Sequence, residues 1–161
     1  MNHSALDVAE YLLQRASEVS RALSPMKLIK LVYIAHGWML GLYGRPLFHE
    51  DVEAWRYGPV IRELYHEIKK FRARAVPVGQ IALSDDASEF DEYEKGVMNQ
   101  VHDVYGTKYS ALQLSKMTHS PGTPWDIVYN KMGQDFVIPN DLIEHHYADL
   151  YRKYGKSDSS D

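Results

Sequence analysis

The stretch that decides the fold runs from Ser24 to Phe71 and reads SPMKLIKLVYIAHGWMLGLYGRPLFHEDVEAWRYGPVIRELYHEIKKF. Its Ser-Pro start is typical of a helix, with a serine N-cap followed by proline at the first helical position. From Pro25 to Tyr43, apolar residues occupy most of the helical circumference before Gly44 and Pro46 end the pattern. A helix that is apolar nearly all round lies in the middle of its domain, so this segment is predicted to be the central helix.

A short strand and a second helix are predicted after the central helix. Residues 47–57 alternate in a way that suits a strand, and the Gly58-Pro59 pair after them predicts a break. Residues 60–71 return to helical periodicity and carry basic residues in the last turn, where the helix dipole favours positive charge. The stretch therefore predicts a helix, a small β element and another helix in close succession.

The rest of the chain also reads mainly as helices. The segment 72–83 is broken by proline and glycine and is predicted to be a loop that leads into a possible second strand. We therefore expect a mainly α fold, a compact helical domain around the central apolar helix, with a small β hairpin or short sheet. Residues 1–155 are predicted to form one domain, and the polar residues 156–161 a disordered tail. The other predicted helices are Ala5–Leu23 with Ser4 as N-cap, Phe90–Tyr105, Ala111–Met117 with Ser110 as N-cap, Trp125–Lys131, and Asp141–Tyr154 with Asn140 as N-cap.

The composition excludes several function classes. The chain of 161 residues has a net charge of −4, which argues against nucleic-acid binding because that needs a basic face. It contains no cysteine, so disulfides, cysteine zinc sites and cysteine nucleophiles are excluded. The first residues are acidic where a secretion signal would be basic, and the most apolar window, 28–43, is too short to span a membrane. We expect a cytoplasmic protein that does not associate with a membrane.

Short patterns that resemble catalytic or metal sites all have simpler explanations. Ser24-Pro-Met-Lys27 matches the S-x-x-K pattern of acyl-enzymes, but the companion motifs are missing and helix capping explains the serine. Glu63-x-x-His66 has no second copy, which a carboxylate-bridged di-metal site would need. The polar run 49–51 is typical of a surface loop. The sequence therefore predicts no enzyme activity, no metal and no cofactor.

An enzyme acting on a small molecule stays open as the rival hypothesis. Its site would be a pocket lined by His36, Glu53 and His119. Against it, a lone histidine on an apolar helix, such as His36, is typical of a hydrogen-bonded core residue, although its free pKa near neutrality leaves a contact or pH-sensing role open.

Aromatic residues favour a protein-contact function instead. The chain has 12 tyrosines and three tryptophans, and Trp55, Tyr57 and Tyr65 gather around the predicted strand-to-helix break. Tyrosine and tryptophan are enriched at protein interfaces, where they give a large contact area at a low entropic cost. Core filling accounts for most of them, so the pattern supports an interface without locating it.

Four sequence blocks together resemble the Panacea domain family. These are residues 26–38 (MKLIKLVYIAHGW), 44–48 (GRPLF), 52–60 (VEAWRYGPV), and the pair formed by 114–119 (LSKMTH) and Pro124-Trp125. They occur in the family's order, and the resemblance covers nearly the whole chain. The family includes the SocA-like antitoxins and the phage-associated GepA-like proteins.

The resemblance implies a mainly α-helical domain and an antitoxin role, with a link to phage defence. Family members are similar in neutralising a toxin encoded by the adjacent gene, mostly by direct binding, while one branch acts as an adaptor that delivers its toxin to an ATP-dependent protease. The resemblance supplies no catalytic residue. The candidates for toxin contact or for holding the scaffold, most of them family signature positions, are Lys27, Tyr33, His36, Glu53, Trp55, Tyr57, Tyr65, His119 and Trp125.

Overall fold

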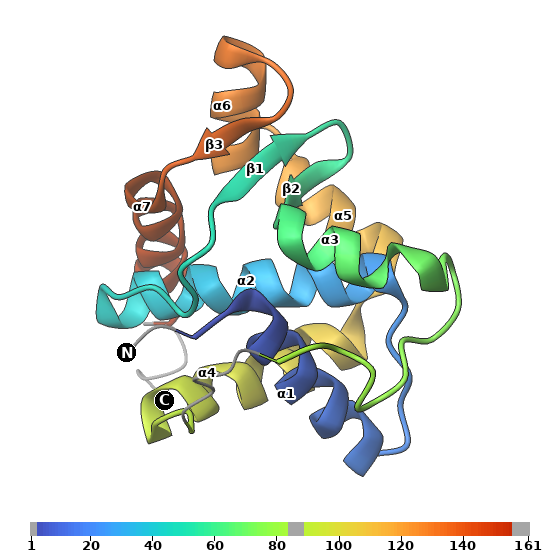
Figure 1. The fold of residues 1–161 in the computed structure, drawn as a ribbon. Helices are drawn as coiled ribbons and strands as arrows, with labels where there is room; N and C mark the ends of the chain where they lie inside the picture. Colours follow the sequence, from blue (N-terminus) through green and yellow to red (C-terminus); the bar gives the residue numbers. More distant parts are fainter. Residues whose placement is uncertain (1–2, 84–88, 156–161) are drawn as a thin grey trace.

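The predicted central helix is α2, Pro25–Tyr43, and it crosses the middle of the molecule in Figure 1. This computed structural model describes residues 3–83 and 89–155, so the predicted tail at 156–161 lies outside the described residues. The Ser24 hydroxyl caps α2 by accepting a hydrogen bond from the backbone N–H of Lys27, and Gly44 ends the helix in the left-handed conformation. Most of the circumference of α2 is buried, as its apolar sequence predicts.

Four helices pack around α2: α1 (Ala5–Glu18), α4 (Glu92–Val101), α5 (Ala111–His119) and α7 (Asn140–Leu150). Figure 1 shows α1 and α4 on one side of α2 and α7 standing against its C-terminal half. The approach of α7 is close because Gly37 and Gly41 have no side chain. A Cβ at either glycine would overlap with Tyr147 of α7. The prediction of a mainly α fold around a central apolar helix is confirmed.

Some of the helix ends lie where the capping residues predict them, and others do not. Ser4 and Ser110 each form a capping box at the start of α1 and α5, as predicted for N-caps. The prediction of Asn140 as a cap is wrong, because Pro139 holds the N-cap position and Asn140 is the first residue of α7. The predicted extension of the first helix to Leu23 is also wrong, since the chain turns after Glu18 and Ser20 adopts a positive φ of 56°.

Two of the helices end in π-helical turns that the sequence did not predict. Helix α4 continues into η2 (His102–Gly106), and α7 continues into η3 (Tyr151–Gly155). The predicted helices Phe90–Tyr105 and Asp141–Tyr154 therefore exist, but each changes its hydrogen-bonding pattern near its C-terminus. Such π turns are rare and often occur at functional sites.

A small antiparallel sheet lies across α2 from α1 and α4, in the strand order β2-β1-β3 (Figure 1). The strands are β1 (Val52–Trp55), β2 (Gly58–Val60) and β3 (Phe136–Ile138). The predicted break at Gly58-Pro59 is wrong, because both residues belong to β2 and pair with Trp55 and Ala54 of β1. Strand β3 was not predicted, because it has only three residues and it is fixed by pairing with β1 rather than by its own pattern.

Two further helices frame the sheet. Helix α3 (Arg62–Ile68) continues into the 3₁₀ turn η1 (Lys69–Phe71), and α6 (Pro124–Met132) follows α5. Helix α3 starts two residues later than predicted because Val60 is held in β2. The predicted second strand after the loop 72–83 is absent from the described residues up to 83. In residues 3–83 and 89–155, no helix combines the length and apolarity that crossing a membrane requires.

Candidate functional site

A buried lysine connects α2 to the β hairpin. The Lys30 side chain is 3% exposed, and its Nζ donates hydrogen bonds to the carbonyl oxygens of Pro59 at 3.0 Å and Tyr57 at 3.4 Å. Burial lowers the pKa of Lys30 to about 7. A neutral amine still has two N–H groups, which match the two carbonyl acceptors. Lys30 therefore fixes the hairpin turn in either protonation state.

Helix α5 holds the same turn from the other side. The Ser115 hydroxyl donates a hydrogen bond of 3.0 Å to the Tyr57 carbonyl oxygen and lies 3.4 Å from His119 Nδ1. Gly58 lies between these groups with a φ of +122°, and a Cβ there would be 2.8 Å from Lys30 Nζ. Glycine suits this position because the positive φ strains any residue with a side chain, and a Cβ would also displace the Lys30 amine. We call Lys30, Tyr57, Gly58, Ser115 and His119 the hairpin cluster.

Strand β1 carries an ion pair, an aromatic contact and a hydrogen-bonded carbonyl next to the hairpin cluster. Arg62 donates hydrogen bonds to both carboxylate oxygens of Glu53, which lowers the pKa of Glu53, and the Trp55 indole N–H also donates to this carboxylate. The Trp55 ring makes an edge contact with Tyr65. The Trp125 indole N–H donates to the Trp55 carbonyl oxygen at 2.5 Å, which attaches α6 to the sheet.

The structure thus brings six of the candidate residues together and separates the other three. Glu53, Trp55, Tyr57, Tyr65, His119 and Trp125 gather around the hairpin. The Tyr33 side chain is buried in the core next to Tyr147, and burial raises the pKa of its hydroxyl. His36 is fully buried. Lys27 lies in the first turn of α2 and is half-buried.

His36 is a hydrogen-bonded core residue, the simpler of its two readings. Its Nδ1 accepts a hydrogen bond from the backbone N–H of Leu47, its Nε2 lies 3.0 Å from Asn140 Oδ1, and its ring stacks on Phe48. These contacts make it the neutral tautomer with the proton on Nε2. Burial lowers the pKa of His36 to about 4. His36 therefore joins α2, the loop before β1 and the start of α7.

The rival enzyme site does not assemble from its three residues. His36 contacts Leu47 and Asn140, whereas Glu53 is paired with Arg62 and His119 lies against Trp125 at a ring distance of 5.3 Å. Within the hairpin cluster, Lys30 and Ser115 direct their polar atoms at backbone carbonyls of the hairpin. Within residues 3–83 and 89–155, no group of three His, Cys, Asp or Glu side chains is arranged to hold a metal ion.

Sequence reasoning missed Lys30 and Ser115 as members of this cluster. Lys30 lies inside the predicted central apolar helix. That position was a usable signal, because a lysine on the buried face of a central helix must find acceptors or lose its proton. Ser115 gave no signal, since its partner is a backbone carbonyl 58 residues away.

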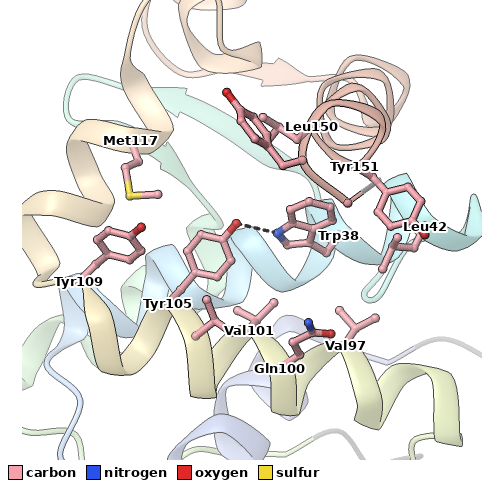
Figure 2. Close-up of a pocket in the computed structure, with 13 residues that line it drawn as sticks. Trp38, Leu42, Val97, Gln100, Val101, Tyr105, Tyr109, Met117, Leu150 and Tyr151 are labelled. Carbon is pink, nitrogen blue, oxygen red and sulfur yellow. Dashed lines mark hydrogen bonds between the residues drawn. The ribbon is translucent and has the colours of Figure 1, made fainter. Parts of the chain in front are cut away.

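A large apolar groove lies on another face of α2 (Figure 2). Trp38 and Leu42 form its floor, and its volume is about 630 Å³. The Trp38 indole N–H donates a hydrogen bond of 3.1 Å to the Tyr105 hydroxyl inside the groove. Figure 2 shows Met117 and Tyr109 at one end and Leu42, Val97 and Tyr151 at the other. We call this the apolar groove. Its other lining residues come from α4, α5, α7, the π turns and the connection between η2 and α5: Val97, Gln100, Val101, Val104, Tyr105, Tyr109, Met117, Leu150, Tyr151, Tyr154 and Gly155.

The two π turns form parts of both walls of the apolar groove. Tyr105 comes from η2 at the end of α4, and Tyr151, Tyr154 and Gly155 come from η3 at the end of α7. Tyr151 and Tyr154 are 51% and 67% exposed, which is high for aromatic rings that line a concave surface. Exposed aromatic residues around a hollow are typical of protein interaction sites.

A second, smaller pocket lies on the same two helices, since Tyr43 follows Leu42 on α2 and Tyr93 lies one turn before Val97 on α4. It is lined by Tyr43, Arg45, Asp91 and Tyr93, and the rings of Tyr43 and Tyr93 meet edge to face at 5.1 Å. None of the candidate residues from the sequence lines either pocket. The groove was missed because its residues come from four helices whose apolar spacing looks like ordinary core packing.

Comparisons with known proteins agree with the resemblance seen in the sequence. The family model described as antitoxin SocA-like, Panacea domain, matches residues 28–126. Antitoxin SocA of Caulobacter vibrioides is 29% identical over 154 residues, which cover 90% of this chain and 80% of that protein. No solved structure matches the chain.

Proposed function

The chain belongs to the SocA-like Panacea domain family, and on that premise we propose that it is an antitoxin that binds a toxin protein directly. The toxin is the product of the adjacent gene, and the binding takes place in the cytoplasm. Residues 1–155 act as one antitoxin domain. The observation that carries the proposal is the apolar groove of about 630 Å³, which exposes aromatic residues but holds no group of catalytic character.

The polar clusters of this chain support binding over catalysis. Lys30 and Ser115 direct their polar atoms at backbone carbonyls of the hairpin, and Glu53 is neutralised by Arg62. These groups hold the hairpin and its neighbours in place, and they leave the apolar groove as the surface suited to a partner. A contact area of this kind neutralises a toxin by covering part of its surface.

Co-expression tests this function. Cells that express the adjacent gene alone should stop growing, and expression of this chain beside it should restore growth. The purified proteins should form a stable complex in size-exclusion chromatography. Continued toxicity in the presence of soluble, folded antitoxin would contradict the proposal.

A second strain separates direct blocking from delivery to a protease. Rescue should persist in cells that lack the ATP-dependent protease, with the toxin level unchanged. Rescue that disappears in those cells, together with a longer toxin lifetime, would instead assign this chain to the adaptor mechanism.

A further inference from the structure

We infer that the apolar groove receives one amphipathic helix of the toxin, whose apolar face covers Trp38 and Tyr105 and whose acidic end lies beside Lys108 and Lys116. This inference rests on the proposed function and names the contact through which it operates. Four observations lead to it: the kind of elements that line the groove, an exposed glycine on its rim, the charges at its ends, and a pair of exposed aromatic residues next to it in the chain.

The first observation is that helices and helical turns supply most of the groove. Its floor is α2 and its walls are α4 with η2, α7 with η3, and part of α5. The backbone N–H and C=O groups of these elements are largely hydrogen-bonded within the helices. The polar side-chain groups of the lining are few: the Gln100 amide, the tyrosine hydroxyls and the Trp38 indole N–H. An extended peptide would leave its own backbone polar groups unpaired there, whereas a helix satisfies them internally.

The second observation is Gly96 in the middle of α4. It is exposed, and a Cβ at this position would meet nothing within 4 Å in the isolated chain. Glycine inside a helix costs stability relative to alanine, and no contact within residues 3–83 and 89–155 requires it. Gly96 lies one turn before Gln100, which lines the groove. A small residue on the rim allows the backbone of a second helix to approach closely.

The third observation is a charge difference along the groove. Lys108 and Lys116, the neighbours of Tyr109 and Met117 in the chain, are exposed and take part in no ion pair among the described residues. At the opposite end, Arg45 is paired with Asp91 at 2.6 Å. Acidic side chains at one end of the occupant complement the two free lysines.

The fourth observation is a pair of exposed aromatic residues next to the groove in the chain. Tyr43 follows Leu42 on α2, Tyr93 lies one turn before Val97 on α4, and their rings meet edge to face. A helix in the groove can therefore place successive anchors, spaced three or four residues apart, along one line of apolar contacts. Together the four observations describe a helical occupant with a defined direction.

Binding measurements on matched variants test the inference, with the full chain and the purified product of the adjacent gene. Met117→Asp adds a charge to the groove, and Leu112→Asp is its control, because Leu112 is an exposed apolar residue of the same helix outside the groove. We expect Met117→Asp to raise the Kd at least about tenfold and Leu112→Asp to change it less than about threefold.

Gly96→Leu provides a variant that does not depend on disturbing the fold. The substitution removes a helix-interior glycine in open space, so the Tm should stay equal or rise. The bulky side chain should nevertheless obstruct the incoming helix and raise the Kd at least about tenfold. An unchanged Kd for both Gly96→Leu and Met117→Asp would overturn the inference.

Charge reversal tests the direction of the helix. Lys108→Glu with Lys116→Glu should weaken binding at low salt, and the loss should shrink as salt is added. The control is Lys69→Glu with Lys70→Glu, two exposed lysines of η1 that do not line the groove. Equal effects from both pairs would refute the assigned direction.

A photo-crosslinking side chain at Met117 should capture a toxin segment with helical apolar spacing and acidic residues, and capture of a strand or loop would overturn the inference.

Other occupants give distinct results. A dimer of the isolated chain in light scattering that Met117→Asp converts to a monomer would show that a second copy covers the groove. A small molecule bound in native mass spectrometry would show a ligand pocket instead. If the unmodified chain fails to bind the toxin, the proposed function itself fails. If it binds and neutralises while the groove variants behave like it, only the inference about the groove fails.

Discussion

The buried lysine of the hairpin cluster gives the sharpest prediction about stability. The Lys30 side chain is buried, and its pKa falls from 10.5 to about 7 in the folded chain. Substitution by methionine keeps a similar apolar stem and removes the titrating group. We expect the free energy of unfolding to depend on pH differently in the unmodified chain and in Lys30→Met, even if the two proteins are equally stable at one pH.

The sign and size of this difference follow from proton linkage. Between pH 7 and pH 10.5 the unfolded chain keeps the Lys30 proton while the folded chain has lost it. The unfolded state binds more protons in this range, so the free energy of unfolding rises with pH. Integrated from pH 7 to pH 9, the lysine protein should gain about 2 kcal/mol relative to Lys30→Met.

Urea denaturation at pH 7 and pH 9 measures this quantity. Tryptophan fluorescence follows unfolding, and the difference between the two proteins cancels the contributions of the tyrosines and other groups they share. A difference that stays constant within about 0.5 kcal/mol between the two pH values would refute the reasoning. It would mean that Lys30 keeps its proton in the folded chain, through contact with water or an unrecognised anionic partner.

Three further results are expected. Gly37→Ala should lower the free energy of unfolding by about 1–3 kcal/mol, because the new Cβ would overlap with Tyr147. Gly96→Ala should raise it by up to about 1 kcal/mol, because the new Cβ meets open space. Thermal denaturation distinguishes the two variants. Ser24→Ala should cost about 1 kcal/mol in urea denaturation through loss of the N-cap and leave toxin neutralisation intact, and lost neutralisation in a folded variant would point to chemistry at the serine. From pH 7 to pH 4.5 the free energy of unfolding should fall by about 2 kcal/mol relative to that of His36→Gln. The reason is that the unfolded state takes up the imidazole proton below pH 6.5, whereas the folded state takes it up only near pH 4. Parallel pH profiles of the two proteins would contradict the buried, neutral histidine.

Local signals in the sequence predicted the helices well. Helix α2 begins after Ser24 and ends at Gly44, as capping preferences predict. The capping residues Ser4 and Ser110 likewise lie where α1 and α5 begin. These predictions succeeded because a helix satisfies its backbone within the segment, so neighbouring residues contain the necessary information.

The failures involve elements whose hydrogen bonds come from elsewhere in the chain. Gly58-Pro59 looks like a break, yet it is a strand because β1 pairs with it and Lys30 binds its turn. Strand β3 exists because β1, more than 80 residues earlier, offers its other edge. Asn140 looks like a cap, but its side chain contacts His36 of α2.

The sequence by itself determined the family, the central helix, the capped helix starts and the mainly α fold, since these depend on local spacing and on blocks of residues in order. Only the tertiary structure decided which residues meet. It gathered six candidate residues around the hairpin, buried Tyr33 and His36 as scaffold, and formed the apolar groove from four helices. The physical reason is that a binding surface is a property of distant segments placed side by side, and each segment's own spacing is equally compatible with an ordinary core.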